Sequence, residues 1–371
     1  MRLLMAVVGG ALLVLILRDA FETVILPRRI RRHFRLTSIF YRTSWHLWRG
    51  LATPLAGGAR EAWLSWFGPL SLLVLLALWA FGIILAFGAM HWALGSALVM
   101  REHLPGFLDD LYLSGTTFFT LGLGDVVPRV AAAKVLVVTE SGLGFAFLAI
   151  IIGYLPVIYQ AFSRREIAIS MLDARAGSPP TAGELLRRHP MGTDPTGLST
   201  LLGEWERWSA EILESHLSYP VLAYYRSQHG NQSWLAALTT VLDTSALVMV
   251  TGTEPCVRQA RLTFAMARHA VVDLAQVFSA PRPDQLGERL SEPDLVRLSQ
   301  QLGEAGSRLE APETRARFSE LRRMYELYIA ALSEHLALPL PGWFRHPVVP
   351  DNWEGAPWKH IPTGSQPPEH F

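Results

Sequence analysis

The sequence predicts an all-α membrane protein, and three observations support this class. Half of the 371 residues are hydrophobic and only 18% are charged, whereas soluble globular chains carry about 25% charged residues. The mean hydropathy of the chain is positive. Apolar residues recur at helical spacing through much of the C-terminal half, and no alternating run of a length suited to a strand stands out.

The first predicted element is an N-terminal transmembrane helix over residues 1–27. Its apolar part approaches the ~20 residues that a helix needs to cross a bilayer. Arg18, Asp19 and Glu22 interrupt it near its second end. Arg18 and Glu22 are four residues apart, where opposite charges on a helix can pair. No small-residue cleavage site follows, so we interpret the segment as a retained span rather than a secretion signal.

Two further segments predict spans. Residues 69–92 contain no Asp, Glu, Lys or Arg, and residues 131–160 contain a single acid, Glu140. Both are long enough to cross the bilayer. An acid inside a membrane span is costly and marks a candidate functional residue.

The basic residues predict the orientation of these spans. Residues 28–67 carry eight arginines against one acid, Glu61, and such loops face the cytoplasm. Arg164 and Arg165 follow the third span. We therefore expect a multi-pass protein of the cell membrane with its N-terminus outside and its C-terminal part in the cytoplasm.

Residues 28–67 also contain many aromatic residues. Arginines mixed with tryptophans suit helices that lie on the inner membrane face and contact lipid. The alternative is an ordinary cytoplasmic helical hairpin packed on the spans. We favour the interfacial interpretation.

The connection between the second and third spans predicts a re-entrant segment. Residues 108–119 can form a short helix that begins at Asp109 or Asp110. The helix is too short to cross the membrane, so it must enter and return, which is possible only where protein or water surrounds the backbone.

The return segment, residues 120–125, predicts an ion filter. It reads Thr120, Leu121, Gly122, Leu123, Gly124, Asp125. Alternate glycines allow backbone conformations that a side chain would forbid. Four such segments around one axis would give rings of carbonyl oxygens that replace the hydration shell of a cation. Leu121 and Leu123 should then point away from the axis and pack behind the filter.

This pattern resembles the pore loop of the potassium channel superfamily, in its single-pore-loop, two-helix form. The likeness lies in residues 116–128, a Thr-x-Gly-x-Gly-Asp string after a short helix. It implies a pore domain over residues 68–162, with an outer helix, a pore helix, the filter and an inner helix. Because the chain has one pore loop, the resemblance implies a homotetramer. It also implies that potassium binds at the backbone carbonyls of Thr120, Leu121, Gly122 and Leu123.

Leu123 departs from the commonest form of the family, which has tyrosine there, and is similar to the second pore loop of some two-pore-domain potassium channels. A leucine cannot tie the filter to the pore helix by a hydroxyl group. We therefore expect a softer filter with less strict selectivity for potassium over sodium.

Candidate supporting and gating residues lie around the filter. Glu140 is expected at filter depth, where it can bond Thr116 or Thr117; solvation in a polar pocket is the alternative. Gly144 occupies the place of the family's hinge glycine. Gly153 and Pro156 follow on the same span, where glycine and proline let a membrane helix bend. The alternative for the glycines is close helix packing.

Residues 163–338 predict a helical cytoplasmic domain, entered through a turn at residues 177–180. Residues 234–250 are apolar enough for a fourth span, but they are short, contain Asp243 and lack a basic flank, so a buried helix is favoured. Residues 339–371 are rich in Pro, Trp and His and predict an extended tail, either loose or packed on the helical domain.

Several functions are excluded by missing patterns. The net charge of +1 gives no sign of nucleic-acid binding, and the single cysteine, Cys256, excludes a disulfide framework. No nucleotide-binding, metalloprotease or hydrolase motif is evident, so we expect no enzymatic activity and no cofactor besides permeant potassium. Alternative functions are a weakly selective cation channel and a membrane-anchored sensor with a non-conducting pore domain. A regulator of the cytoplasmic domain is expected but unidentified.

Overall fold

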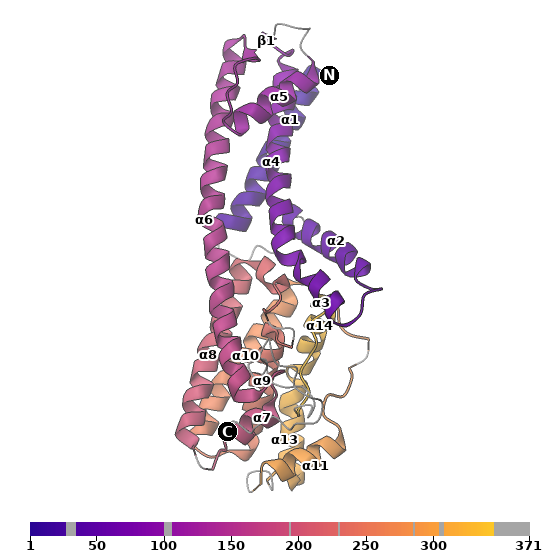
Figure 1. Cartoon of the computed structure of the whole chain (residues 1–371), viewed down its shortest axis with the longest axis vertical. Coiled ribbons are helices and arrows are strands. Elements are labelled where there is room, and N and C mark those ends of the chain that lie inside the picture. The colour runs from indigo at the N-terminus through magenta and orange to yellow at the C-terminus, as the bar shows by residue number, and fades with distance from the viewer. Residues whose placement is uncertain are drawn as a thin grey trace, which may run out of the picture. The chain divides into compact units, whose positions relative to one another are not determined.

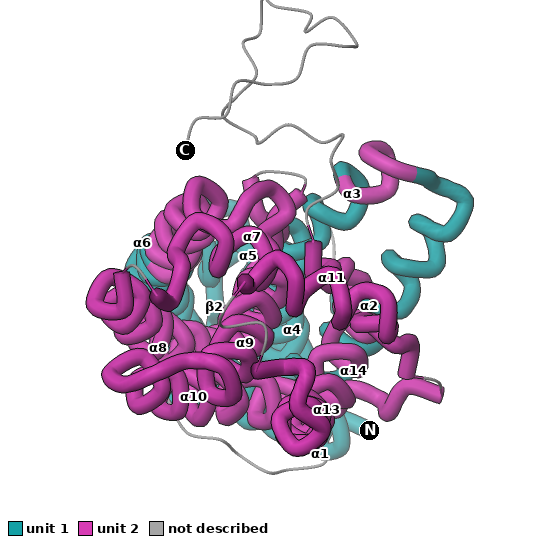
Figure 2. The backbone as a smooth tube through the Cα atoms, turned by 90° about the horizontal axis from the view of Figure 1, so that it is seen from below, with its two compact units in different colours: residues 1–56, 62–160 teal, residues 57–61, 161–371 magenta. Residues whose placement is uncertain are grey.

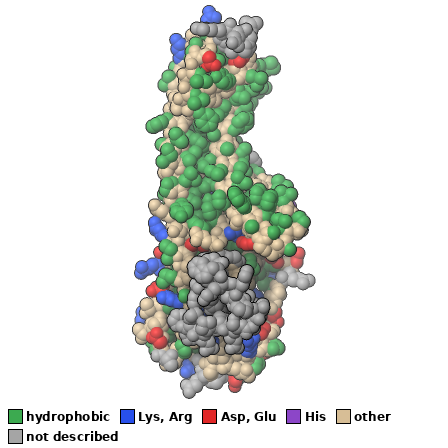
Figure 3. All heavy atoms as spheres, in the orientation of Figure 1, with side chains coloured by type: hydrophobic (Ala, Val, Ile, Leu, Met, Phe, Trp, Pro, Cys, Tyr) green, Lys and Arg blue, Asp and Glu red, His purple; other side chains and the backbone are tan. Residues whose placement is uncertain are grey.

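A computed structural model of the chain describes residues 1–26, 35–99, 106–192, 194–228, 231–284, 286–303 and 308–344. Within these ranges the chain is helical apart from turns and two strands of two residues each. This confirms the all-α membrane class. The chain divides into two compact units, residues 1–56 with 62–160 and residues 57–61 with 161–371 (Figure 2). On the face in Figure 3, hydrophobic side chains cover much of unit 1.

Four helical stretches are long and apolar enough to cross a membrane: Arg2–Ile25, Gly57–Ala93, Ala131–Ala176 and Trp234–Thr251. The first three belong wholly or largely to unit 1 and expose large hydrophobic side chains. The fourth lies inside unit 2.

Unit 1 begins with α1 (Arg2–Ala20), which continues as a short π-helical turn, η1 (Phe21–Ile25). Helix α1 packs along α4 (Phe67–Ala93). The contact is close because Gly9 lacks a side chain: a Cβ atom there would lie 2.7 Å from the carbonyl oxygen of Ala86. The predicted pair forms, with 2.9 Å between Arg18 Nε and Glu22 Oε1.

Asp19 joins three helices of unit 1. Its carboxylate accepts hydrogen bonds from the Thr37 hydroxyl (2.6 Å), the Thr37 backbone N–H (3.3 Å) and the Trp79 indole N–H (3.0 Å). Only 5% of Asp19 is exposed. A buried carboxylate needs such donors to offset its lost hydration, so this acid is part of the packing of α1, α2 and α4.

The basic segment forms α2 (Leu36–Leu51) and α3 (Gly57–Ser65). The rings of Trp48 and Trp63 stack 4.5 Å apart, and each indole N–H donates to the other residue's carbonyl oxygen. Helix α2 exposes Leu47 and Leu51 next to basic side chains. Four of the arginines that define this segment in the sequence, residues 28, 29, 31 and 32, lie outside the described residues.

The remainder of unit 1 is α5 (Phe107–Phe118) and the first part of α6 (Ala131–Ala176), with β1 (Leu98–Val99) paired antiparallel to β2 (Val127–Pro128). Figure 1 shows α5 between α4 and α6 at the end of unit 1 that carries β1. The short β-ladder joins the segment before α5 to the segment after the filter.

Helix α6 corrects one predicted boundary. The inner helix was expected to end at residue 160, but the helix continues to Ala176. Beyond residue 160 the mean hydropathy falls, yet Ile169, Leu172 and Ala176 keep helical spacing and are buried in unit 2. The fall in hydropathy therefore marks a change of surroundings and not a helix end. The helix stops at Gly177, whose φ of +83° is easy only for glycine.

Unit 2 contains nine further helical elements in the described ranges. They are α7 (Ala182–Arg188), α8 (Pro195–Ser218), η2 (Pro220–Tyr224), α9 (Trp234–Thr251), α10 (Cys256–Val277), α11 (Glu292–Gln301), η3 (Arg308–Glu310), α13 (Pro312–Arg323) and α14 (Glu326–Leu336). Side chains all round α9 are buried. This agrees with the favoured buried helix and not with a fourth span. The start of the predicted tail packs on this unit, since the Gly183 N–H donates to the Trp343 carbonyl; residues 345–371 lie outside the described residues.

Candidate functional site

The short helix α5 is fixed at its start by two carboxylates. Asp109 accepts a hydrogen bond from the Gly106 backbone N–H (2.8 Å), which caps the first turn. Asp110 is buried and accepts from the Ser96 hydroxyl (2.5 Å), just after α4. Close packing holds α5 on α4, because a Cβ at Gly88 would lie 3.3 Å from the Leu111 Cα. The predicted start at Asp109 or Asp110 falls within this first turn.

The chain leaves α5 through a helix-ending turn that starts the candidate filter, residues 120–125. The Thr120 N–H donates to the Thr117 carbonyl (3.0 Å), and the Leu121 N–H donates to the Thr116 carbonyl (2.8 Å). Thr120 has a φ of +57°. This pair of bonds around a left-handed residue is the Schellman arrangement, usually built on glycine. A β-branched residue with positive φ is uncommon and is found where the surrounding structure holds it.

Positive φ recurs at every second residue of the filter: +57° at Thr120, +58° at Gly122 and +77° at Gly124. No atom lies within 4 Å of a Cβ built at either glycine. The glycines are therefore required by backbone conformation and not by lack of space. Alternation between positive and negative φ is the geometry in which successive carbonyls can turn toward one side.

The two filter leucines do not pack as expected within one chain. Leu121 is 60% exposed and Leu123 is 64% exposed. The expectation that they pack behind the filter is therefore not met by the chain's own helices. An apolar surface that one chain leaves uncovered beside its filter is available to a neighbouring copy.

Tyr112 is a supporting residue that sequence reasoning missed. Its hydroxyl donates to Asp125 Oδ2 (2.8 Å), while the Val126 N–H donates to Oδ1 (3.1 Å). Position 123, where the commonest form of the resembled family has a tyrosine, is a leucine. Here the hydroxyl comes from α5 and reaches Asp125, so residues 120–125 are tied to α5 after all. A tyrosine one turn after the capping acids was the available signal.

Glu140 bonds the pore helix, but through a different residue than expected. The hydroxyl of Ser114 contacts Glu140 Oε1, and the same hydroxyl lies 2.7 Å from the carbonyl oxygen of Ile84. Thr116 instead donates to the Leu113 carbonyl of its own helix (3.0 Å). Thr116 and Thr117 were thus the wrong partners. A residue two positions away on a helix points to a nearly opposite face, which places Ser114 toward α6.

The surroundings of Glu140 hold few polar groups. Glu140 and His91 are both fully buried, with 4.0 Å between Glu140 Oε2 and His91 Nε2. Among the described residues, neither that carboxylate oxygen nor either ring nitrogen has a hydrogen-bond partner. A serine hydroxyl carries one proton, so both Ser114 contacts form together when Glu140 is protonated and donates to Ser114.

The candidate hinge residues behave differently from one another. At Gly144 a Cβ would lie 2.9 Å from the carbonyl carbon of Phe118, so this glycine allows α6 to touch the end of α5. This favours the packing interpretation at Gly144. Around Gly142 and Gly153 the space is open. Pro156 lies inside the continuous helix, where it cannot donate a backbone hydrogen bond. Bending at Gly153 and Pro156 stays a prediction.

Comparison with known proteins bears on this region. Residues 72–160 match the model of a family described as ion channel, and this range holds most of α4, all of α5, the filter and the first part of α6. This part of the chain is thus similar to an ion channel family.

One relative is similar over about two thirds of this chain. The uncharacterized membrane protein YdjJ of Bacillus subtilis (strain 168) is 24% identical over 259 residues, which cover 68% of this chain and 73% of the relative. No solved structure matches the chain at a significant level.

Proposed function

We propose that the chain is one subunit of a homotetrameric channel that passes potassium passively across the cell membrane. The observation that carries the proposal is the alternation of positive φ at Thr120, Gly122 and Gly124, directly after the short, capped helix α5. Four copies around an axis would present rings of carbonyl oxygens from Thr120, Leu121, Gly122 and Leu123. Such oxygens replace the water around a dehydrated cation.

Two further features support this assembly. Helix α5 ends at the filter, and the carbonyl end of a helix carries partial negative charge that favours a cation. The exposed Leu121 and Leu123 would be covered by neighbouring copies. In this proposal the N-terminus is outside, the basic α2 and α3 lie on the inner membrane face, and unit 2 is cytoplasmic.

A second candidate is a cation channel with weak selectivity, which Leu123 favours because its side chain makes no polar bond behind the filter. Reversal potentials distinguish the two. The purified protein is placed in liposomes with opposed potassium and sodium gradients. The current through a selective channel should then reverse near the equilibrium potential of potassium. A reversal near zero identifies the weakly selective one.

The test of conduction uses Gly122→Ala. Alanine at a φ of +58° is strained, and the carbonyl of this peptide should turn from the axis. We expect loss of potassium flux with the assembly retained, whereas Gly50→Ala, on α2 with open space around it, should conduct normally. Undiminished flux in Gly122→Ala excludes the filter mechanism. If the wild-type protein passes no ions, the remaining candidate function is that of a membrane-anchored sensor with a non-conducting pore domain.

A further inference from the structure

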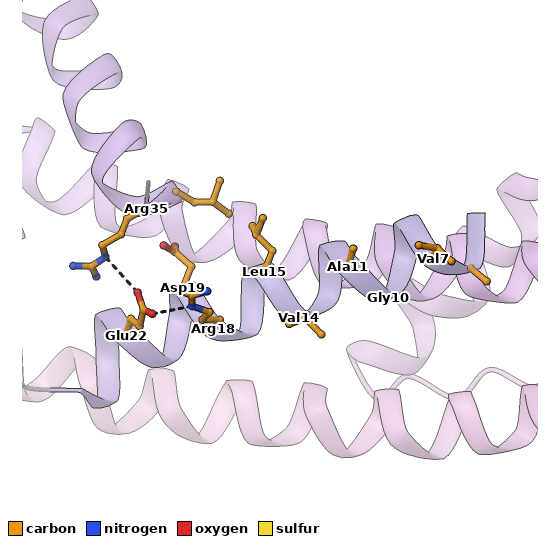
Figure 4. Close-up of a pocket in the computed structure, with 11 residues that line it drawn as sticks. Val7, Gly10, Ala11, Val14, Leu15, Arg18, Asp19, Glu22 and Arg35 are labelled. Carbon is orange, nitrogen blue, oxygen red and sulfur yellow. Dashed lines mark hydrogen bonds and ion pairs between the residues drawn. The ribbon is translucent and has the colours of Figure 1, made fainter. Parts of the chain in front are cut away.

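A groove runs along the side of α1 that faces away from α4, and it ends at the start of α2 (Figure 4). Its volume is about 590 Å³. Small residues, Gly10 and Ala11, form its floor between Val7 and Val14, and its far end is charged. A stretch of small residues on an exposed membrane helix is by itself only a shallow surface. The charged end gives this groove two chemically different halves.

The apolar half is about as long as one membrane leaflet. From Val7 to Arg18 the helix rises about 16 Å at ~1.5 Å per residue. Half of a ~30 Å hydrocarbon core is about 15 Å. The lining begins at Ala6 and does not extend to the more N-terminal, exposed Leu3 and Leu4. A transmembrane helix from a second copy would continue across the second leaflet, whereas an acyl chain of a lipid stops near the midplane.

The charged end presents guanidinium groups. Glu22 lies between Arg18 and Arg35, with 2.9 Å from Arg18 Nε to Oε1 and 3.9 Å from Arg35 Nε to Oε2 (Figure 4). One carboxylate thus faces two arginines. The other nearby acid, Asp19, is buried and engaged by donors from α2 and α4.

Donors remain available on both arginines. The Arg35 Nη2 group donates to the Thr23 hydroxyl (3.2 Å). Within the described part of the chain, Arg35 Nη1 and both Nη atoms of Arg18 make no hydrogen bond, and the Arg18 side chain is 52% exposed. Guanidinium forks of this kind match the oxygens of a phosphate group.

We propose that this groove binds one anionic phospholipid from the leaflet at the Arg18 end. One acyl chain lies over Gly10 and Ala11, and the phosphate is held by Arg18 and Arg35. The site belongs to α1 and the start of α2, outside the region that matches the ion channel family. It gives the N-terminal span a ligand of its own, whether or not the filter conducts.

The charge test compares lipid retention. The full chain, purified in detergent, is mixed with phosphatidylglycerol and phosphatidylcholine, and lipid adducts per subunit are counted by native mass spectrometry. We expect the wild type to retain one phosphatidylglycerol in preference. The double variant Arg18→Gln, Arg35→Gln should lose this preference about tenfold or more, since each arginine near a lipid surface contributes ~1 kcal/mol. Arg42→Gln, exposed on α2 and outside the groove, is the matched control.

A second test examines the shape of the groove by placing a larger side chain on its floor. No atom lies within 4 Å of a Cβ at Gly10, so Gly10→Leu occupies the groove without displacing neighbours. It should abolish retention of both lipids, whereas Val8→Phe adds similar bulk on an exposed position outside the groove and should change nothing. A preference for phosphatidylglycerol that survives the arginine double variant overturns the proposal. So does a Gly10→Leu variant that keeps its lipid but forms smaller oligomers, because the occupant is then a second copy. Neither readout depends on ion flux.

Discussion

Two fully buried acids, one in each unit, have opposite kinds of partner. Asp243 on α9 is 1% exposed and pairs with the Arg289 guanidinium, and it also accepts from the Tyr325 hydroxyl (2.5 Å). Glu140 on α6 is 0% exposed and has a neutral hydroxyl, that of Ser114, with an imidazole 4.0 Å away. The cost of burying an ionised carboxylate is large in both places.

The difference shows what each acid can do. Asp243 faces the full positive charge of Arg289, so this buried pair is tied to the folding of unit 2. Glu140 has no such counter-charge among the described residues and fits its site in the neutral form. Its side chain reaches from α6 to Ser114 of α5, where we expect a change in its bonding to alter the candidate filter more than the stability of the fold.

Removing the paired acid should have the largest effect. Asp243→Ala leaves the Arg289 charge buried without its carboxylate, which costs about 3–5 kcal/mol. Thermal unfolding of the purified chain, followed by circular dichroism, should show a markedly lower midpoint. Glu320→Ala, which breaks an exposed pair with Arg317, should cost under ~1 kcal/mol. Equal unfolding midpoints for the two variants would contradict this expectation, because Asp243 would then contribute no more stability than a surface acid.

A second paired acid in unit 2 should show the same dependence on charge through pH. Burial opposes ionisation of Glu184, but hydrogen bonds and charges from Arg187 and Arg188 lower its pKa from 4.5 to about 2. Because the folded-state pKa lies below the unfolded value, this carboxylate stabilises the fold above pH ~4.5, and the stabilisation is lost as the pH falls toward about 2. Glu184→Gln should cost about 2 kcal/mol at neutral pH.

The control for Glu184 is the pH dependence itself. Wild type and Glu184→Gln should approach each other in unfolding midpoint as the pH falls from about 4.5 toward 2, because the wild-type carboxyl then becomes protonated and neutral like the amide. A difference that stays constant across this range would mean that charge is not the cause.

Removing the Tyr112 hydroxyl should have a smaller effect on stability and a visible one on conduction. Tyr112→Phe loses the hydrogen bond to Asp125, worth about 1 kcal/mol, and frees the outer end of the filter. We expect the potassium-to-sodium permeability ratio from reversal potentials to fall several-fold. Tyr159→Phe, at an exposed position of α6, is the matched control. An unchanged ratio in Tyr112→Phe means that this bond does not order the filter.

The smallest expected effect sharpens the contrast with Asp243. Glu140→Gln keeps the size of the side chain and a hydrogen-bonding group for Ser114. The free energy of unfolding, measured from thermal unfolding, should therefore change by less than ~1 kcal/mol. A loss as large as that of Asp243→Ala would show that Glu140 is ionised in the fold and that the two acids are alike.

Features that depend on a few consecutive residues could be predicted from the sequence. Features that depend on how a helix is rotated about its axis could not. Hydropathy located three helices long and apolar enough to cross a membrane, and glycine spacing located the alternation of positive φ, because each depends on a few consecutive residues. The partner of Glu140 was placed on the right helix but on the wrong face, since Ser114 and Thr116 differ only in the rotation of α5. Tyr112 and Asp125 are far enough apart in sequence that only the turn at Thr120 brings them together.

The end of α6 illustrates the same limit in another way. Falling hydropathy after Tyr159 was taken as the end of a helix, although it reports only the surroundings of the side chains. The residues that continue the helix, among them Ile169 and Leu172, are apolar at helical spacing, and the pattern became clear once the helices of unit 2 that cover them were in view.

The single carboxylate of Asp19 limits how this molecule can be trimmed. A shortened version that began at α4, as the match to the ion channel family suggests, would strand the indole N–H of Trp79 in apolar surroundings without an acceptor. Excising the pore domain would then require replacing Trp79, for instance with phenylalanine, in the same step. The hydrogen bond between Asp19 and Trp79 thus couples α1 to α4, and the two helices should be engineered and expressed together.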